Sequence, residues 1–180
     1  MKEATAFIAP PAKPFWLFRF LVWMAERVAS QPLLPARLLL WYPPAAFSSG
    51  VLEALIADGR RDLNPRLLQL VRLQTSFAVA CPFCIAMNSA EVEGEQLTPD
   101  ELAALRGHTP LEAVTTFSER ERLAVQYARL ITQTPLKFYP DFIAQLKQNF
   151  TEREIVIIAT TAAQVNYWAR LIQALGIPTQ

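Results

Sequence analysis

The sequence predicts an all-α protein, built as a single-domain helical bundle, and two observations support this. No stretch of the 180 residues shows sustained alternation of apolar and polar side chains, and no Asn-Gly or Asp-Gly turn separates two β-rich runs. Four segments match the capping box, in which a Ser or Thr and a Glu three residues later satisfy each other's backbone N–H groups. These pairs are Thr98 with Glu101, Thr109 with Glu112, Ser118 with Glu121, and Thr151 with Glu154.

Proline and glycine set the order of the expected elements. Prolines 10, 11 and 14 favour an extended start over residues 1–14. The pair Pro43-Pro44 predicts a turn, and glycines at positions 59, 94, 107 and 176 stand where helix C-terminal caps belong. We expect helices over residues 15–29, 35–41, 50–57, 65–80, 81–93, 99–106, 110–116, 119–133, 140–149 and 152–174.

Two of these helices are apolar on most sides. Residues 15–24 contain one charge, and residues 155–169 contain none. The first run is too short to cross a membrane, so we expect a buried or interface helix there rather than an interfacial anchor. The second run belongs in a core or between subunits. No membrane span is expected.

Composition limits the classes of partner. The chain is 52% hydrophobic and 18% charged, which is poor in charge for a soluble domain and predicts a homo-oligomer. The net charge of +1, from 17 basic and 16 acidic residues spread along the chain, argues against nucleic-acid binding, which would need a basic patch. Lys2 and Glu3 do not form the basic start of a signal peptide, so we expect a cytoplasmic protein with reduced thiols at rest.

The only two cysteines stand three residues apart in the motif Cys81-Pro82-Phe83-Cys84. The motif lies in the longest charge-free stretch of the chain, residues 73–90. Three-residue spacing on a helix places both sulfurs on one face, within the distance that a disulfide requires. The pair therefore indicates redox chemistry.

The local structure of the motif has two readings. Pro82 suits the first position of a helix, which would make Cys81 the N-cap and favour its thiolate at the positive helix end. Alternatively, the preceding helix continues through the motif and apolar burial favours the thiol. Two inert core cysteines remain a further alternative. A zinc site is disfavoured, because two cysteines and His108 do not supply four ligands from one chain.

Two amides are the polar candidates near the cysteines. Asn88 follows Cys84 by one helical turn on the same face, and Gln69 precedes Cys81 by twelve residues. Each is either a hydrogen-bond donor to the reacting sulfur or a satisfied core amide. Glu91 reaches the same face three residues after Asn88.

Several of these segments resemble one known family. Leu70-Val71-Arg72-Leu73 and the run from Cys81 to Ser89, followed by Leu97–Glu101, Phe117–Arg122 and Asn166–Leu171, resemble the alkylhydroperoxidase D-like / carboxymuconolactone decarboxylase superfamily. The resemblance covers about residues 50–176, and residues 1–49 resemble the N-terminal helical extension of longer members. It implies an all-helical fold that assembles as a trimer or hexamer.

The resemblance also implies a catalytic activity and a reason why that activity is weak. Members with this motif are thiol-dependent peroxidases, so Cys84 would attack the peroxide, Cys81 would resolve the sulfenic acid, and an external dithiol such as a lipoylated protein would restore the pair. No bound cofactor is expected. The family pairs a glutamate and a histidine as a proton relay at positions where this chain has Gln69 and Asn88. Neither amide accepts a proton near neutral pH, so only weak peroxidase activity is predicted.

Three functions therefore compete. The first is a weak thiol-dependent peroxidase or disulfide oxidoreductase at Cys81 and Cys84. The second is a lyase of the decarboxylase type acting on a small carboxylated lactone. The third is a non-enzymatic helical oligomer whose dithiol senses redox state or merely packs.

Overall fold

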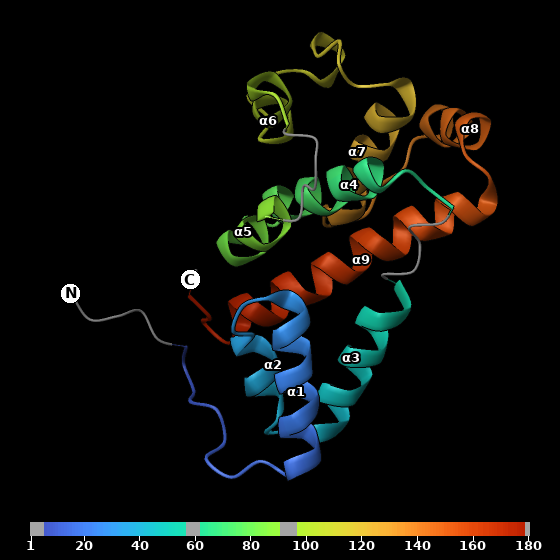
Figure 1. Cartoon of the computed structure of the whole chain (residues 1–180). Helices are drawn as coiled ribbons and strands as arrows, with labels where there is room; N and C mark the ends of the chain where they lie inside the picture. Colours follow the sequence, from blue (N-terminus) through green and yellow to red (C-terminus); the bar gives the residue numbers. More distant parts are fainter. Residues whose placement is uncertain (1–5, 57–61, 91–96, 179–180) are drawn as a thin grey trace.

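The structure, a computed structural model, describes residues 6–56, 62–90 and 97–178, and confirms the all-α prediction (Figure 1). The described residues form helices and contain no strand. The oligomeric state and the division of the chain at residue 50 stay predictions. The elements are α1 Trp16–Ala29, α2 Leu34–Leu39, α3 Pro43–Ile56, α4 Pro65–Ala78, α5 Pro82–Ala90, α6 Pro99–Leu105, the short 3₁₀ helix η2 Leu111–Ala113, α7 Glu119–Thr132, α8 Pro140–Asn149 and α9 Glu152–Ala174.

Three of the four predicted capping boxes are present, at the starts of α6, α7 and α9. The fourth, Thr109 with Glu112, is wrong. The chain forms only a three-residue 3₁₀ turn there, without a side-chain cap, in place of the helix expected over 110–116. Leu111, Val114 and Phe117 are all buried in one core cluster. We attribute the difference to this burial, which outweighs the local capping signal.

The prediction of a turn at Pro43-Pro44 and a helix beginning at residue 50 is also wrong. The two prolines open α3 instead, and the carbonyl of Tyr42 accepts the first hydrogen bonds of that helix, from the N–H groups of Ala45 and Ala46. A proline at the first positions of a helix lacks only an N–H that would have no intrahelical partner. The helix therefore begins seven residues before the predicted start.

Helix α9 runs through the middle of the molecule (Figure 1). It contacts α4 and α7 on one side and α3 on the other, and α5 packs near its C-terminal half. This central position accounts for its uncharged middle. By length and hydropathy alone, α9 is the one helix among the described residues that could span a membrane.

A buried carboxylate joins α4, α6 and the segment before α7. Glu101 is 1% exposed, and its carboxylate accepts hydrogen bonds from the Arg66 guanidinium (2.6 Å), the Thr116 hydroxyl (2.8 Å) and the Thr98 N–H (2.9 Å). Burial alone would raise the pKa of Glu101, but these donors together lower it below its ordinary value. Arg66 also pairs with Glu121 at 2.9 Å.

A second arginine lies at the C-terminal ends of two helices, α6 and α7. Arg129, in the last turn of α7, donates to the Gln74 side-chain oxygen (3.0 Å) and to the carbonyl of Ala104 at the end of α6. A cation there compensates the negative ends of both helices, and burial lowers the pKa of Arg129. Arg129 and Arg106 line a cavity of about 480 Å³ beside Phe77.

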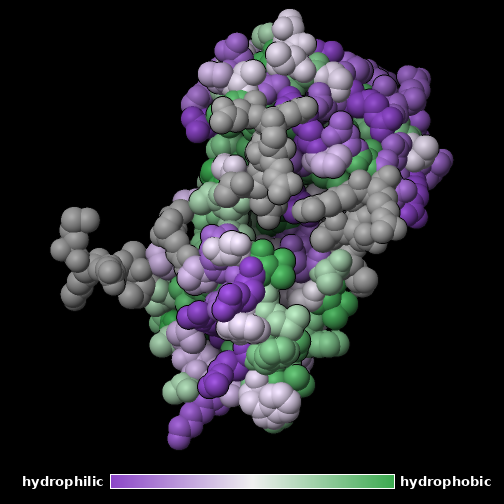
Figure 2. All heavy atoms as spheres, viewed as in Figure 1, coloured by the Kyte–Doolittle hydropathy of each residue, from purple (hydrophilic) through white to green (hydrophobic). Residues whose placement is uncertain are grey.

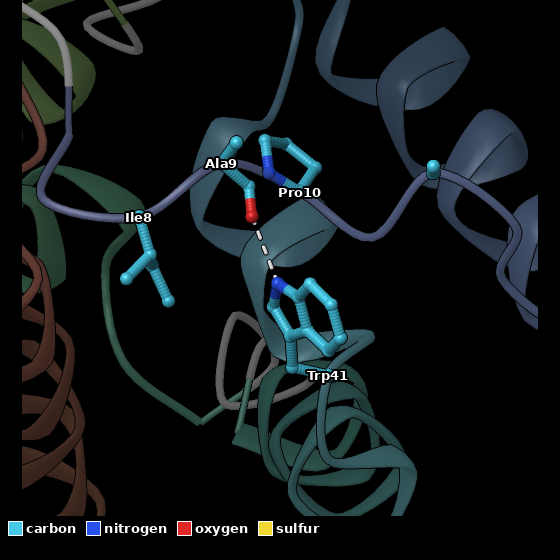
Figure 3. Close-up of a pocket in the computed structure, with 5 residues that line it drawn as sticks. Ile8, Ala9, Pro10 and Trp41 are labelled. Atoms are coloured by element: carbon cyan, nitrogen blue, oxygen red, sulfur yellow. Dashed lines mark hydrogen bonds between the residues drawn. The ribbon is translucent and has the colours of Figure 1, made fainter.

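Residues 8–10 lie beside Trp41, in the turn between α2 and α3. The Trp41 indole N–H donates to the carbonyl of Ala9 at 2.8 Å, beside a shallow hollow lined by Ile8 and Pro10 (Figure 3). Glu26 of α1 holds α2 through the Arg37 guanidinium (2.6 Å) and the Leu33 N–H (2.9 Å). Residues 6–39 therefore form a connected arm, which we call the N-terminal arm.

Candidate active site

The turn between α4 and α5 ends one helix and begins the next. Ala80 has a left-handed backbone (φ 49°). Its N–H donates to the carbonyl of Phe77, and the N–H of Cys81 donates to the carbonyl of Ser76. These two bonds are those of a Schellman motif, which normally places glycine at the left-handed position. The helix therefore does not continue through the cysteine motif.

Cys81 is the N-cap of α5, as one of the two readings predicted. Its carbonyl accepts the first intrahelical hydrogen bond, from Ile85, and its sulfur accepts the N–H of Cys84 at 3.2 Å. That donor and the positive helix end both favour negative charge on the Cys81 sulfur. Cys81 and Cys84 are joined in a disulfide, with their Cα atoms 5.3 Å apart.

The disulfide lies in an apolar cluster and is covered. Cys81 is 0% exposed and Cys84 is 4% exposed. Leu34 and Leu38 of α2, Ile172 of α9 and Ile177 pack in this cluster, as do Ala6, Met87 and Trp168. The Gln31 side chain donates to the Met87 sulfur at 2.6 Å. The N-terminal arm therefore covers the sulfurs, and the cavities lined by Arg129 and by Ile8 do not reach them.

The two predicted amides come together, but neither contacts a sulfur. The Gln69 side chain donates to the backbone carbonyl of Asn88. The Asn88 side-chain amide donates to the Ser76 hydroxyl (2.8 Å), which in turn donates to the carbonyl of Arg72. Both amides thus connect α4 to α5 and hold the helix that carries Cys84.

The remaining candidates lie elsewhere. Glu91 falls outside the described residues, and His108 is exposed in the loop after α6, where its N–H donates to the carbonyl of Ala103. Among the described residues, no group of three or more His, Cys, Asp or Glu side chains is placed to hold a metal.

Sequence reasoning missed two residues that position the site. Gln173 of α9 donates to the carbonyls of Val79 (2.9 Å) and Ala80 (3.2 Å), which fixes the turn directly before Cys81. Trp168 packs beside the cysteines and donates its indole N–H to Glu53 of α3 at 3.0 Å. Both contacts join residues more than 90 positions apart, so no local pattern marks them.

Known proteins share this arrangement. The model of the carboxymuconolactone decarboxylase family matches residues 45–130, which include α4, the cysteine motif and α6. Over these residues the chain is similar to that family, which supports the resemblance to the alkylhydroperoxidase D-like / carboxymuconolactone decarboxylase superfamily. YnjA of Escherichia coli strain K12 is 25% identical over 175 residues, which cover 96% of this chain and 93% of YnjA.

Several solved structures have the same fold along nearly the whole chain. A peroxidase-related protein from Ralstonia eutropha JMP134, described as an alkylhydroperoxidase AhpD core, matches with a TM-score of 0.79 at 16% identity. The match covers 97% of this chain and 92% of that one. The debrominase Bmp8 in complex with 2,3,4-tribromopyrrole matches with a TM-score of 0.78 at 15% identity, over 97% and 94% of the two chains.

The left-handed Ala80 leads to a prediction about stability. We expect Ala80→Gly to raise the free energy of unfolding by about 1 kcal/mol, because a left-handed backbone strains a residue with a Cβ but not glycine. Urea denaturation measures the change. The matched control is Ala86→Gly in the exposed middle of α5, which should lower the free energy of unfolding by about 1 kcal/mol. A loss of stability in Ala80→Gly would contradict the prediction.

Proposed function

We propose that this protein is a cytoplasmic thiol–disulfide oxidoreductase that reduces peroxides weakly at the Cys81–Cys84 pair. One observation carries the proposal: the two sulfurs of this chain lie at the start of a helix within bonding distance of each other. A pair in that position can exchange a disulfide for two thiols without a change in the helix that carries it.

The cycle uses both sulfurs and an external reductant. The Cys84 thiolate attacks one peroxide oxygen, the O–O bond breaks, and an alcohol or water leaves, which produces a sulfenic acid on Cys84. The Cys81 thiol then displaces water and forms the disulfide. A dithiol donor, such as a protein-bound lipoyl group, reduces the pair by exchange and becomes a disulfide itself.

The assignment of the attacking sulfur rests on accessibility and on the superfamily. The helix end and the Cys84 N–H favour charge on Cys81, but Cys81 has no exposed surface, whereas Cys84 keeps a small exposed fraction. Attack by Cys84 leaves Cys81, with its stabilised thiolate, as a good resolving nucleophile.

Buried sulfurs also support the redox-sensor alternative. A disulfide covered by the N-terminal arm exchanges with an external dithiol only when the arm moves aside. In a sensor the pair changes its redox state slowly and once, whereas in an enzyme it turns over many times.

The test is peroxide consumption driven by dihydrolipoamide. We expect wild type to turn over, Cys81→Ser/Cys84→Ser to fall to the rate of buffer alone, and the exposed control Ser89→Ala to match wild type. In Cys81→Ser alone, the sulfenic acid on Cys84 has no partner and should be trapped by dimedone; Cys84→Ser should not form it. Peroxide consumption by the double variant at the wild-type rate would refute the proposal, and a single oxidation without turnover would favour the sensor.

A further inference from the structure

Helix α1 keeps most of its apolar surface uncovered. No residue of α1 is buried, although the helix is the most aromatic part of the chain. Seven large apolar side chains on it are between 41% and 87% exposed: Trp16, Leu17, Phe20, Leu21, Trp23, Met24 and Val28. We call this surface the α1 face.

The α1 face lies on the side of the helix that points away from its own chain. At 100° per residue, Phe18, Val22 and Ala29, which are partly buried, fall on the opposite side. Within the α1 face, Leu17, Leu21, Met24 and Val28 follow one another at intervals of four, three and four residues. That spacing is the apolar seam by which one helix packs lengthwise against another.

Exposed apolar side chains concentrate at this end of the molecule. Trp41, Tyr42 and Phe47 continue the apolar surface from α1 towards α3, and each is more than 60% exposed. Beyond residue 51, the large apolar side chains exposed among the described residues are Leu136, Tyr139, Val156 and Tyr167. Figure 2 shows hydrophobic colouring gathered over the part of the molecule that contains α1 to α3 in Figure 1.

We propose that a second copy of this chain covers the α1 face, with α1 packed against α1. The seven side chains, at about half exposure, leave on the order of 700 Å² accessible. A stable complex buries about 800 Å² from each partner. The α1 face together with the exposed side chains of Trp41, Tyr42 and Phe47 supplies enough area for a specific dimer contact. An apolar seam is self-complementary, as a two-fold contact between identical copies requires.

The charges on α1 favour a protein partner over a lipid surface. The helix has no lysine, and its basic residues are Arg19 and Arg27. The Arg27 guanidinium lies over the Trp23 ring, 5.1 Å from its centroid, rather than extending to solvent. Helices that lie on membranes carry a strongly basic polar face, and lipid imposes no heptad spacing on them.

Pairing of α1 would also hold the cover over the disulfide. Glu26 fixes α1 to α2, and α2 packs Leu34 and Leu38 against the cysteines. A partner that immobilises α1 therefore restrains the same arm that shields the sulfurs.

The test is the mass of the full-length protein by light scattering over a range of concentrations. We expect wild type to associate and Leu21→Glu/Met24→Glu to raise the dissociation constant at least tenfold. Val156→Glu, an equally apolar and exposed helical position on α9, is the matched control and should leave association unchanged. Circular dichroism checks that each variant keeps its helices.

A second measurement uses only the wild-type protein and tests the proposal even if the α1 variant does not fold. Amide hydrogen exchange in wild-type α1 should slow as concentration rises, while exchange in α8 stays constant. A monomeric wild type, association unchanged in the α1 variant, or loss of association only in Val156→Glu would each overturn the proposal. Binding of wild type, but not the α1 variant, to vesicles of neutral and anionic phospholipid without self-association would assign the face to a membrane instead.

Discussion

Gln69→Glu combined with Asn88→His should raise the dithiol-dependent rate of peroxide reduction by about 10²-fold. A histidine at position 88 lies one turn beyond Cys84 and can accept the proton that the thiol loses, which an amide cannot do. The Gln69 amide donates to the carbonyl of residue 88, a bond that a carboxylate cannot make. A glutamate at position 69 is therefore free to accept the N–H of the nearby imidazole and orient the ring. The measurement is initial peroxide consumption with saturating dihydrolipoamide, for each single variant and the pair.

The pH dependence of the rate distinguishes two causes of a faster reaction. One is proton transfer to the new histidine, and the other is easier access to the sulfurs. In the double variant, the rate should rise as the imidazole loses its proton, with a midpoint near pH 6.5. The wild-type protein has no histidine at position 88 and should not show this rise in rate. The same two substitutions in a Cys84→Ser background should give no activity. An unchanged rate in a correctly folded double variant would show that proton transfer is not limiting, and would point to opening of the N-terminal arm instead.

Glu101→Gln should lower the free energy of unfolding by about 2–4 kcal/mol. The substitution keeps the size of the side chain but leaves the Arg66 guanidinium without its buried counter-charge, and removing one partner of a buried pair costs several kcal/mol. Arg66 keeps its ion pair with Glu121, which limits the loss. Urea denaturation at neutral pH measures this change in the free energy of unfolding.

The same carboxylate makes stability depend on pH in a defined direction. Because the pKa of Glu101 is lower in the folded than in the unfolded protein, ionised Glu101 stabilises the fold above its ordinary pKa near 4.5. That contribution disappears as pH falls through the lower, folded-state pKa. Glu101→Gln should therefore flatten the acid side of the stability profile.

The control for Glu101 is a glutamate with the same charge on the surface. Glu119 is 61% exposed and forms an ion pair with Arg122 three residues later, so Glu119→Gln should change the free energy of unfolding by less than about 0.5 kcal/mol. Equal effects of the two substitutions would contradict a special role for the buried carboxylate.

Three helix starts were predictable from sequence, because there the local signal agreed with the packing of the chain. Capping boxes placed the starts of α6, α7 and α9, because the Ser or Thr and the Glu act within one turn. The break before Cys81 was not predictable, because alanine rather than glycine occupies the left-handed position at residue 80. The early start of α3 was missed because a proline pair serves equally in a turn or a helix start.

The candidate site was predictable in its residues but not in its surroundings. The spacing of Cys81 and Cys84 was enough to predict a closable pair, and turn spacing put Asn88 on the same helix. The partners that α2 and α9 contribute, such as Leu38 and Gln173, come from parts of the chain far from the motif. Only the folded chain brings them together.

Both ends of the described chain meet beside the two sulfurs. The N–H of Phe7 donates to the carbonyl of Leu175 at 2.9 Å, and Ala6 and Ile177 pack in the same apolar cluster as the disulfide. A peptide joined close to residue 6 or residue 178 would therefore lie near the reactive pair. Kinetic work on this protein calls for tag-free material, because a fused peptide there changes what reaches the sulfurs.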